Sequence, residues 1–121
     1  MKPALKENLA PLLERLRLYN QAQRLVILAA LCAQPRSVSE IERETGIGQP
    51  ALSQQLGELR RAGLISARRE AREVVYDFAS PGEKFRAEII LSLLKGGSDS
   101  PGQVAMSPGH VGAQFASIIS D

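Results

Sequence analysis

An amide, a hydroxyl and a guanidinium share one side of the segment from residue 49 to residue 63 if that segment is helical. At about 100° per residue its leucines fall on one narrow stripe that must face a core: Leu52, Leu56 and Leu59. The opposite side presents Gln54 and Arg61, with Ser53 on its flank and no carboxylate at its centre. Amides and hydroxyls hydrogen-bond to base edges, and guanidinium groups bind guanine or phosphate. The alternative is an ordinary solvated helix surface. Periodicity alone does not distinguish this alternative from a face that binds nucleic acid.

Arginine is concentrated in the residues that complete and follow this segment. Between positions 60 and 72 there is one acidic residue, Glu70, and there are five arginines: Arg60, Arg61, Arg68, Arg69 and Arg72. The formal net charge of the chain is only +2, because acidic residues elsewhere offset them. A cluster of arginines on a projecting hairpin can follow a phosphate backbone or enter a minor groove. The alternative is a solvated hairpin with no ligand.

The elements that position these residues are mostly helical. Leucines at steps of three and four place one apolar stripe on a first helix that breaks near residue 20, and a second helix runs from about 21 to 33. Ser37 and Glu40 form a capping box that opens a short third helix ending at Gly46. The fourth helix starts around Gln49-Pro50 and stops at Gly63.

After residue 63 the period changes to that of strands. Residues 64–69 and 73–78 form two strand-like runs joined by a turn at 70–72, with Val74, Tyr76 and Phe78 on one face. A second capping box, at 80–83, opens a fifth helix that runs to about residue 95 and is apolar nearly all round over 89–94. The predicted fold is mainly α with a β-hairpin wing (α+β), in the order α-α-α-α-β-β-α. It is a winged helix-turn-helix domain over residues 1–95.

Composition excludes several classes of protein and site. One cysteine cannot build an intramolecular disulfide framework or a Cys-rich zinc site, and one histidine argues against a His-based catalytic metal centre within a single chain. We find no pairing of a nucleophile with a base and no glycine-rich phosphate loop, so we predict no enzyme, no cofactor and no metal. The longest apolar run, residues 25–33, covers half of the ~18 residues that span a bilayer.

The two ends of the chain carry different expectations. The start, residues 1–6, lacks the features of a secretory signal, and we expect a protein of the bacterial cytoplasm, located at the nucleoid. Residues 96–121 are rich in Gly, Ser and Pro and contain no Lys or Arg, so we expect a flexible tail.

Three stretches resemble the ArsR/SmtB family of dimeric winged-helix transcriptional repressors. They are NQAQRLVIL at 20–28, SVSEI at 37–41 and GQPALSQQLGELRRAGL at 48–64, of which the Gln-Pro-x-x-Ser-Gln-x-Leu core is the most specific. The resemblance implies DNA-reading roles for Gln49, Ser53, Gln54 and Gln55. Many members have His where this chain has Gln55, and the helical wheel turns Gln55 partly toward the apolar side.

The resemblance also implies a homodimer formed by the first and last helices. The apolar residues that would form its interface are Leu5, Leu9, Leu12, Leu16, Ile89, Ile90 and Leu93. Two recognition helices would then reach successive major grooves about 34 Å apart on a palindromic site.

Sensing chemistry is less clearly indicated. Metal-sensing members use Cys or His on the third helix, or Asp, Glu and His on the fifth, and this chain has neither set. The chain is more similar to a subgroup that senses reactive sulfur or oxidants through a cysteine pair, but it has only Cys32. Cys32 could act as a redox sensor through sulfenylation, persulfidation or intersubunit pairing. The alternative is a small buried side chain.

The sequence therefore predicts a sequence-specific DNA-binding regulator. We expect a homodimeric repressor on double-stranded operator DNA, released by a redox, sulfur or small-molecule signal. The alternative is a winged-helix module that binds another protein without specific DNA binding, and a MarR-type regulator is the second structural candidate.

Overall fold

The computed structural model describes residues 3–95, which form five helices and a small antiparallel sheet. The helices are α1 (Pro3–Tyr19), α2 (Ala22–Ala33), α3 (Val38–Thr45), α4 (Ala51–Arg61) and α5 (Pro81–Ser92), and a 3₁₀ turn, η1 (Leu93–Lys95), follows α5. The strands are β1 (Arg36–Ser37), β2 (Ile65–Glu70) and β3 (Glu73–Phe78). The predicted winged helix-turn-helix fold is confirmed. The predicted tail, residues 96–121, lies outside the described residues.

One strand was absent from the predicted order. β1 lies between α2 and α3 and pairs antiparallel with β3, with Arg36 opposite Tyr76, so the sheet order is β1-β3-β2. The predicted α-α-α-α-β-β-α order is therefore wrong at this point, because a strand of two residues is too short to show an alternating pattern. The Nε atom of Arg36 also donates to the Ala30 carbonyl, at 2.8 Å, which fastens the strand to α2.

Local signals set most helix ends. At α3 the capping box is complete: Glu40 N donates to Ser37 Oγ at 3.3 Å and Ser37 N donates to Glu40 Oε1 at 2.9 Å. Gly46 ends α3 in the left-handed region at φ 75°, which glycine adopts without strain. The second predicted capping box is half formed, since Ser80 Oγ accepts from Glu83 N at 3.2 Å but the Glu83 carboxylate binds elsewhere. Its partners are the guanidinium groups of two arginines.

The hairpin is one residue tighter at its turn than predicted. Glu70 lies opposite Glu73, so the predicted turn at 70–72 is a two-residue turn of Ala71 and Arg72, with Ala71 at φ 56°. The strand register places Val74, Tyr76 and Phe78 on one face as predicted, and Phe78 is buried.

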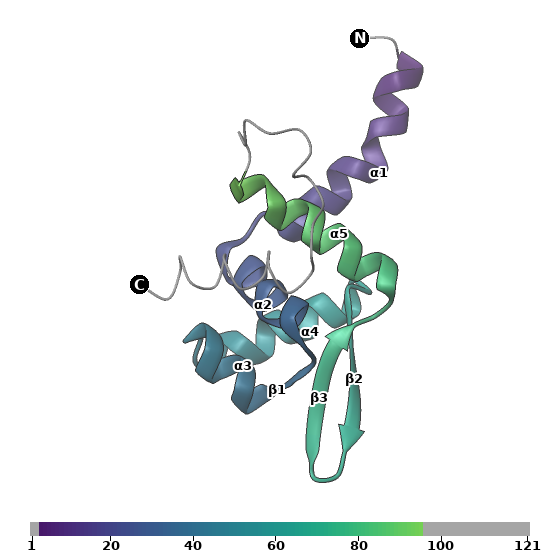
Figure 1. The fold of residues 1–121 in the computed structure, drawn as a ribbon. Helices are drawn as coiled ribbons and strands as arrows, with labels where there is room; N and C mark the ends of the chain where they lie inside the picture. Colours follow the sequence, from purple (N-terminus) through teal and green to yellow (C-terminus); the bar gives the residue numbers. More distant parts are fainter. Residues whose placement is uncertain (1–2, 96–121) are drawn as a thin grey trace, which may run out of the picture.

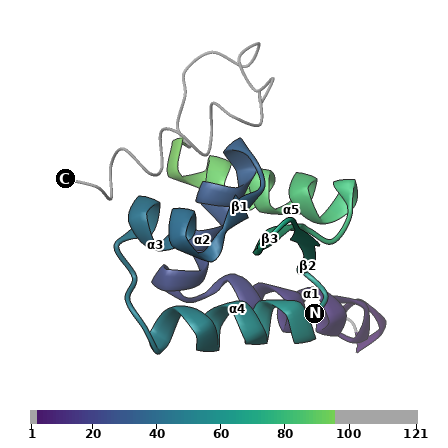
Figure 2. The ribbon, with the colours of Figure 1, turned by 90° about the horizontal axis from the view of Figure 1, so that it is seen from below.

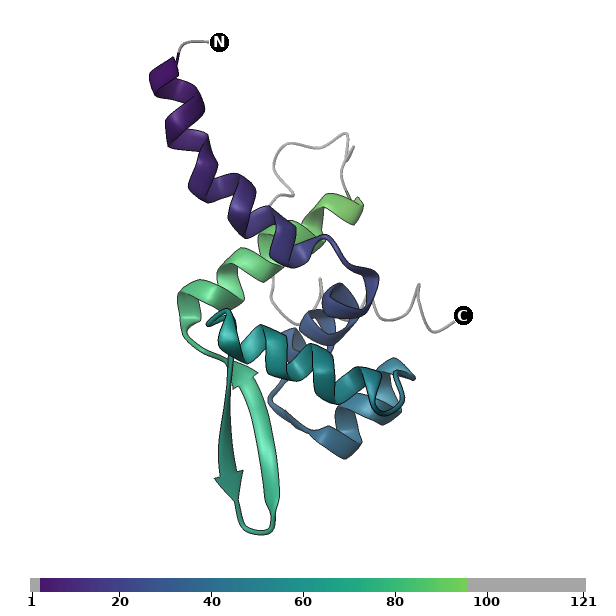
Figure 3. The ribbon, with the colours of Figure 1, turned by 180° about the vertical axis from the view of Figure 1, so that it is seen from behind.

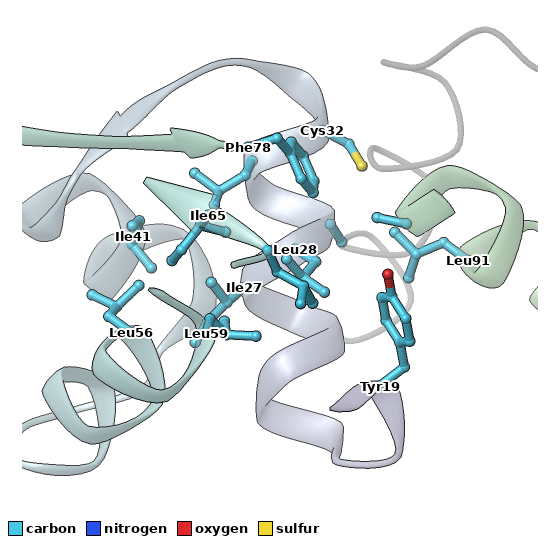
Figure 4. Packing of buried hydrophobic residues seen from close by; sticks show 14 of the residues in the cluster. Tyr19, Ile27, Leu28, Cys32, Ile41, Leu56, Leu59, Ile65, Phe78 and Leu91 are labelled. Atoms are coloured by element: carbon cyan, nitrogen blue, oxygen red, sulfur yellow. The ribbon is translucent and has the colours of Figure 1, made fainter. Parts of the chain in front are cut away.

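α2 forms the centre of the core. Its buried residues Ile27, Leu28 and Leu31 are joined by side chains from the other helices and the hairpin, among them Ile41, Leu56 and Leu91 (Figure 4). α1 projects away from the helical body, and the hairpin extends in the opposite direction (Figure 1). The fold therefore presents two separate surfaces: one around α4 and the hairpin, and one around α1 and α5.

Candidate nucleic-acid interface

The outward face of α4 agrees with the helical wheel drawn from the sequence. Leu52, Leu56 and Leu59 are buried in the core, and Ser53 and Gln54 are exposed. Figure 2 shows α4 at the outer surface of the molecule, with its full length uncovered along one side. Helix periodicity therefore turns the polar groups that can bond to base edges into solvent.

Gln49 and Ser53 form a pair at the start of α4. The Gln49 Oε1 atom accepts from Ser53 N at 3.2 Å and from Ser53 Oγ at 2.5 Å. This side-chain carbonyl accepts a hydrogen bond from one of the backbone N–H groups of the first helical turn, which have no partner within the helix. The amide nitrogen of Gln49 makes no hydrogen bond to residues 3–95 and can donate to a ligand.

Arg61 lies over Gly57 on the same face. A methyl group at position 57 would lie 3.2 Å from Nη1 of Arg61, so the guanidinium rests on the bare glycine backbone. Neither Arg60 nor Arg61 forms an ion pair within residues 3–95, and both are exposed. The C-terminal half of α4 thus presents uncompensated positive charge.

Gln55 is placed differently from its neighbours on α4. Its Oε1 atom accepts from Arg24 Nε at 2.9 Å, and its Nε2 atom donates to Gln21 Oε1 at 3.0 Å and to Gln23 Oε1 at 3.2 Å. The side chain is half-buried and turned toward the start of α2. The structure therefore brings together Gln49, Ser53 and Gln54 on the open face, and it does not bring Gln55 to them.

Charge on the hairpin is less positive than the arginine count implies. Arg68 contacts the Glu70 carboxylate and lies 3.8 Å from Asp77 Oδ2, on the face of the hairpin that also carries Glu73. Arg69 lies on the other face, opposite Val74, and Arg72 lies in the turn. These two arginines form no ion pair with the described part of the chain, so they carry the free charge of the hairpin.

The surface formed by α1 and α5 is apolar and exposed. Of the side chains predicted at a dimer interface, Leu12, Leu16, Ile89 and Leu93 are exposed and Leu9 and Ile90 are half-buried, while the side chain of Leu5 lies outside the described residues. The prediction missed three more exposed side chains: Leu13, Phe85 and Leu94. The signal was present in the sequence, since Phe85, Ile89 and Leu93 recur every four residues.

Comparisons with known proteins agree with this architecture. Residues 22–67 match the family model "Bacterial regulatory protein, arsR family". The "Biofilm growth-associated repressor" of Xylella fastidiosa is 45% identical over 53 residues, which are 44% of this chain and 46% of that protein. The chain thus aligns with a little under half of that relative's length. The "Transcriptional activator HlyU" of Vibrio cholerae is 35% identical over 86 residues, 71% of this chain and 80% of that protein.

The solved structures extend the likeness to the whole described fold. The crystal structure of the transcriptional repressor BigR from Xylella fastidiosa superposes with a TM-score of 0.70 at 25% identity, covering 83% of this chain and 99% of that one. The chain belongs to the ArsR family. ArsR-family proteins are DNA-binding transcriptional regulators, not enzymes, and the resemblance stated from the sequence motifs is confirmed at this level.

Cys32 in this ArsR-family chain is a buried thiol. It is 1% exposed and lies on α2, with its sulfur on the side that faces α5 (Figure 4). Burial, reinforced by the nearby negative charge of Glu88, raises the pKa of the Cys32 thiol to about 12. The thiol is therefore protonated near neutral pH. Because the thiolate is the reactive form, Cys32 is unreactive there. This environment favours the packing role over the sensing role.

Other site types find little support in the described part of this ArsR-family chain. Residues 3–95 hold no cluster of three His, Cys, Asp or Glu side chains that could bind a metal ion. Within the same residues, no helix is both long enough and apolar enough to cross a membrane.

Proposed function

We propose that this ArsR-family chain represses transcription as a homodimer that occupies a palindromic operator in the bacterial cytoplasm. The observation that carries the proposal is the outward face of α4, where exposed amide and hydroxyl groups lie beside guanidinium groups whose positive charge is uncompensated. Polar groups of these types read base edges, and the charge supplies affinity for phosphate.

The proposal assigns different work to the residues of this surface. Gln54, Ser53 and the free amide nitrogen of Gln49 contact base edges in the major groove, where recognition helices insert their N-terminal half. The arginines of the surface contact the phosphate backbone: Arg60 and Arg61 from α4, and Arg69 and Arg72 from the hairpin. Arg68 contributes less, since its charge is shared with Glu70 and Asp77.

The α1–α5 surface supports the homodimer. Phe85 is 59% exposed and Leu93 is 72% exposed, and together with the α1 leucines they form an apolar surface that is costly to leave in water. A shallow groove between the two helices, whose lining includes Leu13, Leu16, Ile90 and Leu93, lies within this surface. A second copy related by a two-fold axis covers such a surface with the same surface, so both copies gain.

Repression follows from occupancy of the promoter. A dimer seated on the operator excludes RNA polymerase, and a ligand that prefers a different spacing of the two recognition helices lowers DNA affinity. The relatives include both a repressor and an activator by name, so the direction of regulation is a separate point for experiment. A small molecule suits the release step better than oxidation of Cys32, because that thiol is buried and protonated.

Fluorescence anisotropy with labelled DNA from upstream of the chain's own gene tests the proposal. We expect specific binding with a Kd in the nanomolar range, since operator complexes typically have Kd values of about 10⁻⁸ M or lower. Affinity should fall steeply with salt, and each phosphate contact that is removed should reduce the slope by about 0.9. Lack of salt-sensitive, specific binding at micromolar protein would overturn the proposal.

The same assay separates the alternative of a protein-interaction module. Replacing Arg69 and Arg72 by glutamine should weaken DNA binding and lower the salt slope, whereas Arg68→Gln should change the slope least. A module that acts only on another protein would show the same weak DNA binding with and without the arginines.

A further inference from the structure

One buried arginine joins three helices and was not among the residues predicted from the sequence. Arg24 lies in the first turn of α2 and is only 9% exposed. Its Nη1 atom donates to the Leu18 carbonyl of α1 at 3.3 Å, and its Nε atom donates to Gln55 Oε1 of α4 at 2.9 Å. Its Nη2 atom contacts the carboxylate of Glu58, one turn further along α4. Figure 3 shows α4 crossing in front of α2, below the C-terminal end of α1.

The geometry of this junction constrains α4. A guanidinium group presents its donors in a rigid planar fork, and a buried one must satisfy them. Gln55 and Glu58 are three residues apart, so they lie on the same side of the helix. Two contacts on one side hold a helix against rotation about its axis, and Gln21 and Gln23 hold Gln55 further through its amide nitrogen.

We propose that Arg24 is a positioning residue for DNA recognition, which fixes the rotation of α4 through Gln55 and Glu58 and ties it to the end of α1. Gln55 therefore acts on DNA through Arg24 and not by contact with a base. The inference rests on the proposed function for its consequence, because α1 belongs to the proposed dimer surface and α4 to the proposed DNA surface. Arg24 is the polar link between the two.

Operator binding by Arg24→Lys, Gln55→Ala and the double variant tests the proposal. Lysine keeps the charge but loses the fork, and each single change should weaken operator binding about tenfold. Because both changes break the same link, the double variant should lose no more than about another twofold, which is strong non-additivity. A scan of single-base operator changes should show no position at which Gln55→Ala alone loses discrimination, whereas Gln54→Ala should lose it.

Arg36→Lys is the matched control for a change in stability. The side chain of Arg36 is as buried as that of Arg24, at 12% against 11% exposed, and it likewise binds a backbone carbonyl and a glutamate. Arg36 joins β1 to α2 and α3, and neither of these two contacts reaches α4, so its loss should lower stability without changing operator affinity. Additive losses for Arg24 and Gln55, or loss of discrimination at one base pair in Gln55→Ala, would overturn the positioning role.

Hydrogen exchange without DNA separates this inference from the proposed function. Arg24→Lys should speed amide exchange in α4 more than in α3, and Arg36→Lys should do the reverse. If the wild-type chain binds no operator, the proposed function fails, and the role of Arg24 in recognition fails with it. The exchange measurement still reports whether Arg24 restrains α4. If the wild-type chain binds but Arg24→Lys changes neither affinity nor exchange, the positioning role alone is overturned.

Discussion

Helices α4 and α5 are nearly equal in length, at 11 and 12 residues, yet their outward faces are opposite in character. α4 buries three leucines and turns polar and positively charged side chains to solvent. α5 buries Ala87 and Leu91 and turns Phe85, Ile89 and Leu93 to solvent. Both faces are exposed in the single chain, so exposure does not distinguish their roles, but the chemistry of the groups does.

The difference indicates what each face can bind. An apolar stripe gains free energy from any complementary apolar surface, and in the proposed homodimer a second copy of α1 and α5 supplies that surface. A polar face gains little from burial unless each donor and acceptor finds a partner, so it suits a ligand with fixed hydrogen-bonding groups. Base edges provide such groups.

Loss of the α5 stripe should give the largest effect. Ile89→Asp places a charge in the centre of the proposed dimer surface, so we expect monomers by light scattering. Operator affinity should fall by about 100-fold or more, because the two half-sites are no longer bound by one linked molecule. Ile89→Leu, which keeps the stripe apolar, should retain both the dimer and the affinity. A stable dimer of the aspartate variant would place the interface elsewhere.

A change on the α4 face should have the next largest effect. Gln54→Ala removes an amide that can pair with adenine, and we expect operator affinity to fall by about tenfold or more, since a bidentate contact discriminates by about 1–3 kcal/mol. The affinity for non-operator DNA should not change, and neither should the dimeric state. Gln34→Ala, at an exposed glutamine just after α2, is the control and should bind as the wild type does. Equal affinity for Gln54→Ala and wild type would remove Gln54 from the readout.

Local signals in the sequence predicted most of this contrast. The spacing of Leu52, Leu56 and Leu59 depends only on helix geometry, and the Ser37–Glu40 box depends on atoms three residues apart. Helix and turn signals of this kind act within one element. For that reason the outward face of α4 and the hairpin strands could be placed without knowledge of the rest of the molecule.

Features that depend on contacts between elements could not be predicted in the same way. β1 exists because β3 offers it a partner, and Arg68 is compensated because the strand register brings Asp77 beside it. The family resemblance implied that Gln55 reads DNA, whereas the helical wheel turned it partly toward the apolar side. Its hydrogen bond to Arg24, which is distant in sequence, could be predicted from neither. Side-chain pairing across elements therefore decides which polar residues remain free for a ligand.

A change of one methyl group can test whether the flat part of α4 matters. Gly57→Ala should stabilise the fold by about 0.5–1 kcal/mol, because alanine is the better helix former. The new methyl group would press on the Arg61 guanidinium, 3.2 Å away, so we expect operator affinity to fall only about two- to threefold, as for one displaced charge at a surface. Urea unfolding and anisotropy measure the two effects. An unchanged affinity with raised stability would show that Arg61 need not rest on Gly57.

The smallest effect on DNA binding is expected from the inner face of α5, where the contrast with α4 is also present. The inner face of α4 buries only leucines, whereas the inner face of α5 buries Glu88. This side chain is 6% exposed, and its Oε2 atom makes no hydrogen bond to residues 3–95. Burial raises the pKa of Glu88, opposed in part by Lys84. A raised pKa in the folded state means that stability from this group is present below its unfolded pKa and is lost as pH rises through the folded pKa.

Glu88→Gln removes this charge while keeping the size of the side chain. At pH 7 the variant should be more stable than the wild type by roughly 1 kcal/mol, because its neutral amide avoids the cost of a desolvated carboxylate. The gain should vanish below about pH 4, where the wild-type carboxyl is protonated in both states. Urea unfolding at the two pH values measures it, with Glu73→Gln on the exposed hairpin as the control. A gain that persisted at low pH would have to come from packing and not from charge, and operator affinity should be the same in either case because Glu88 faces the core.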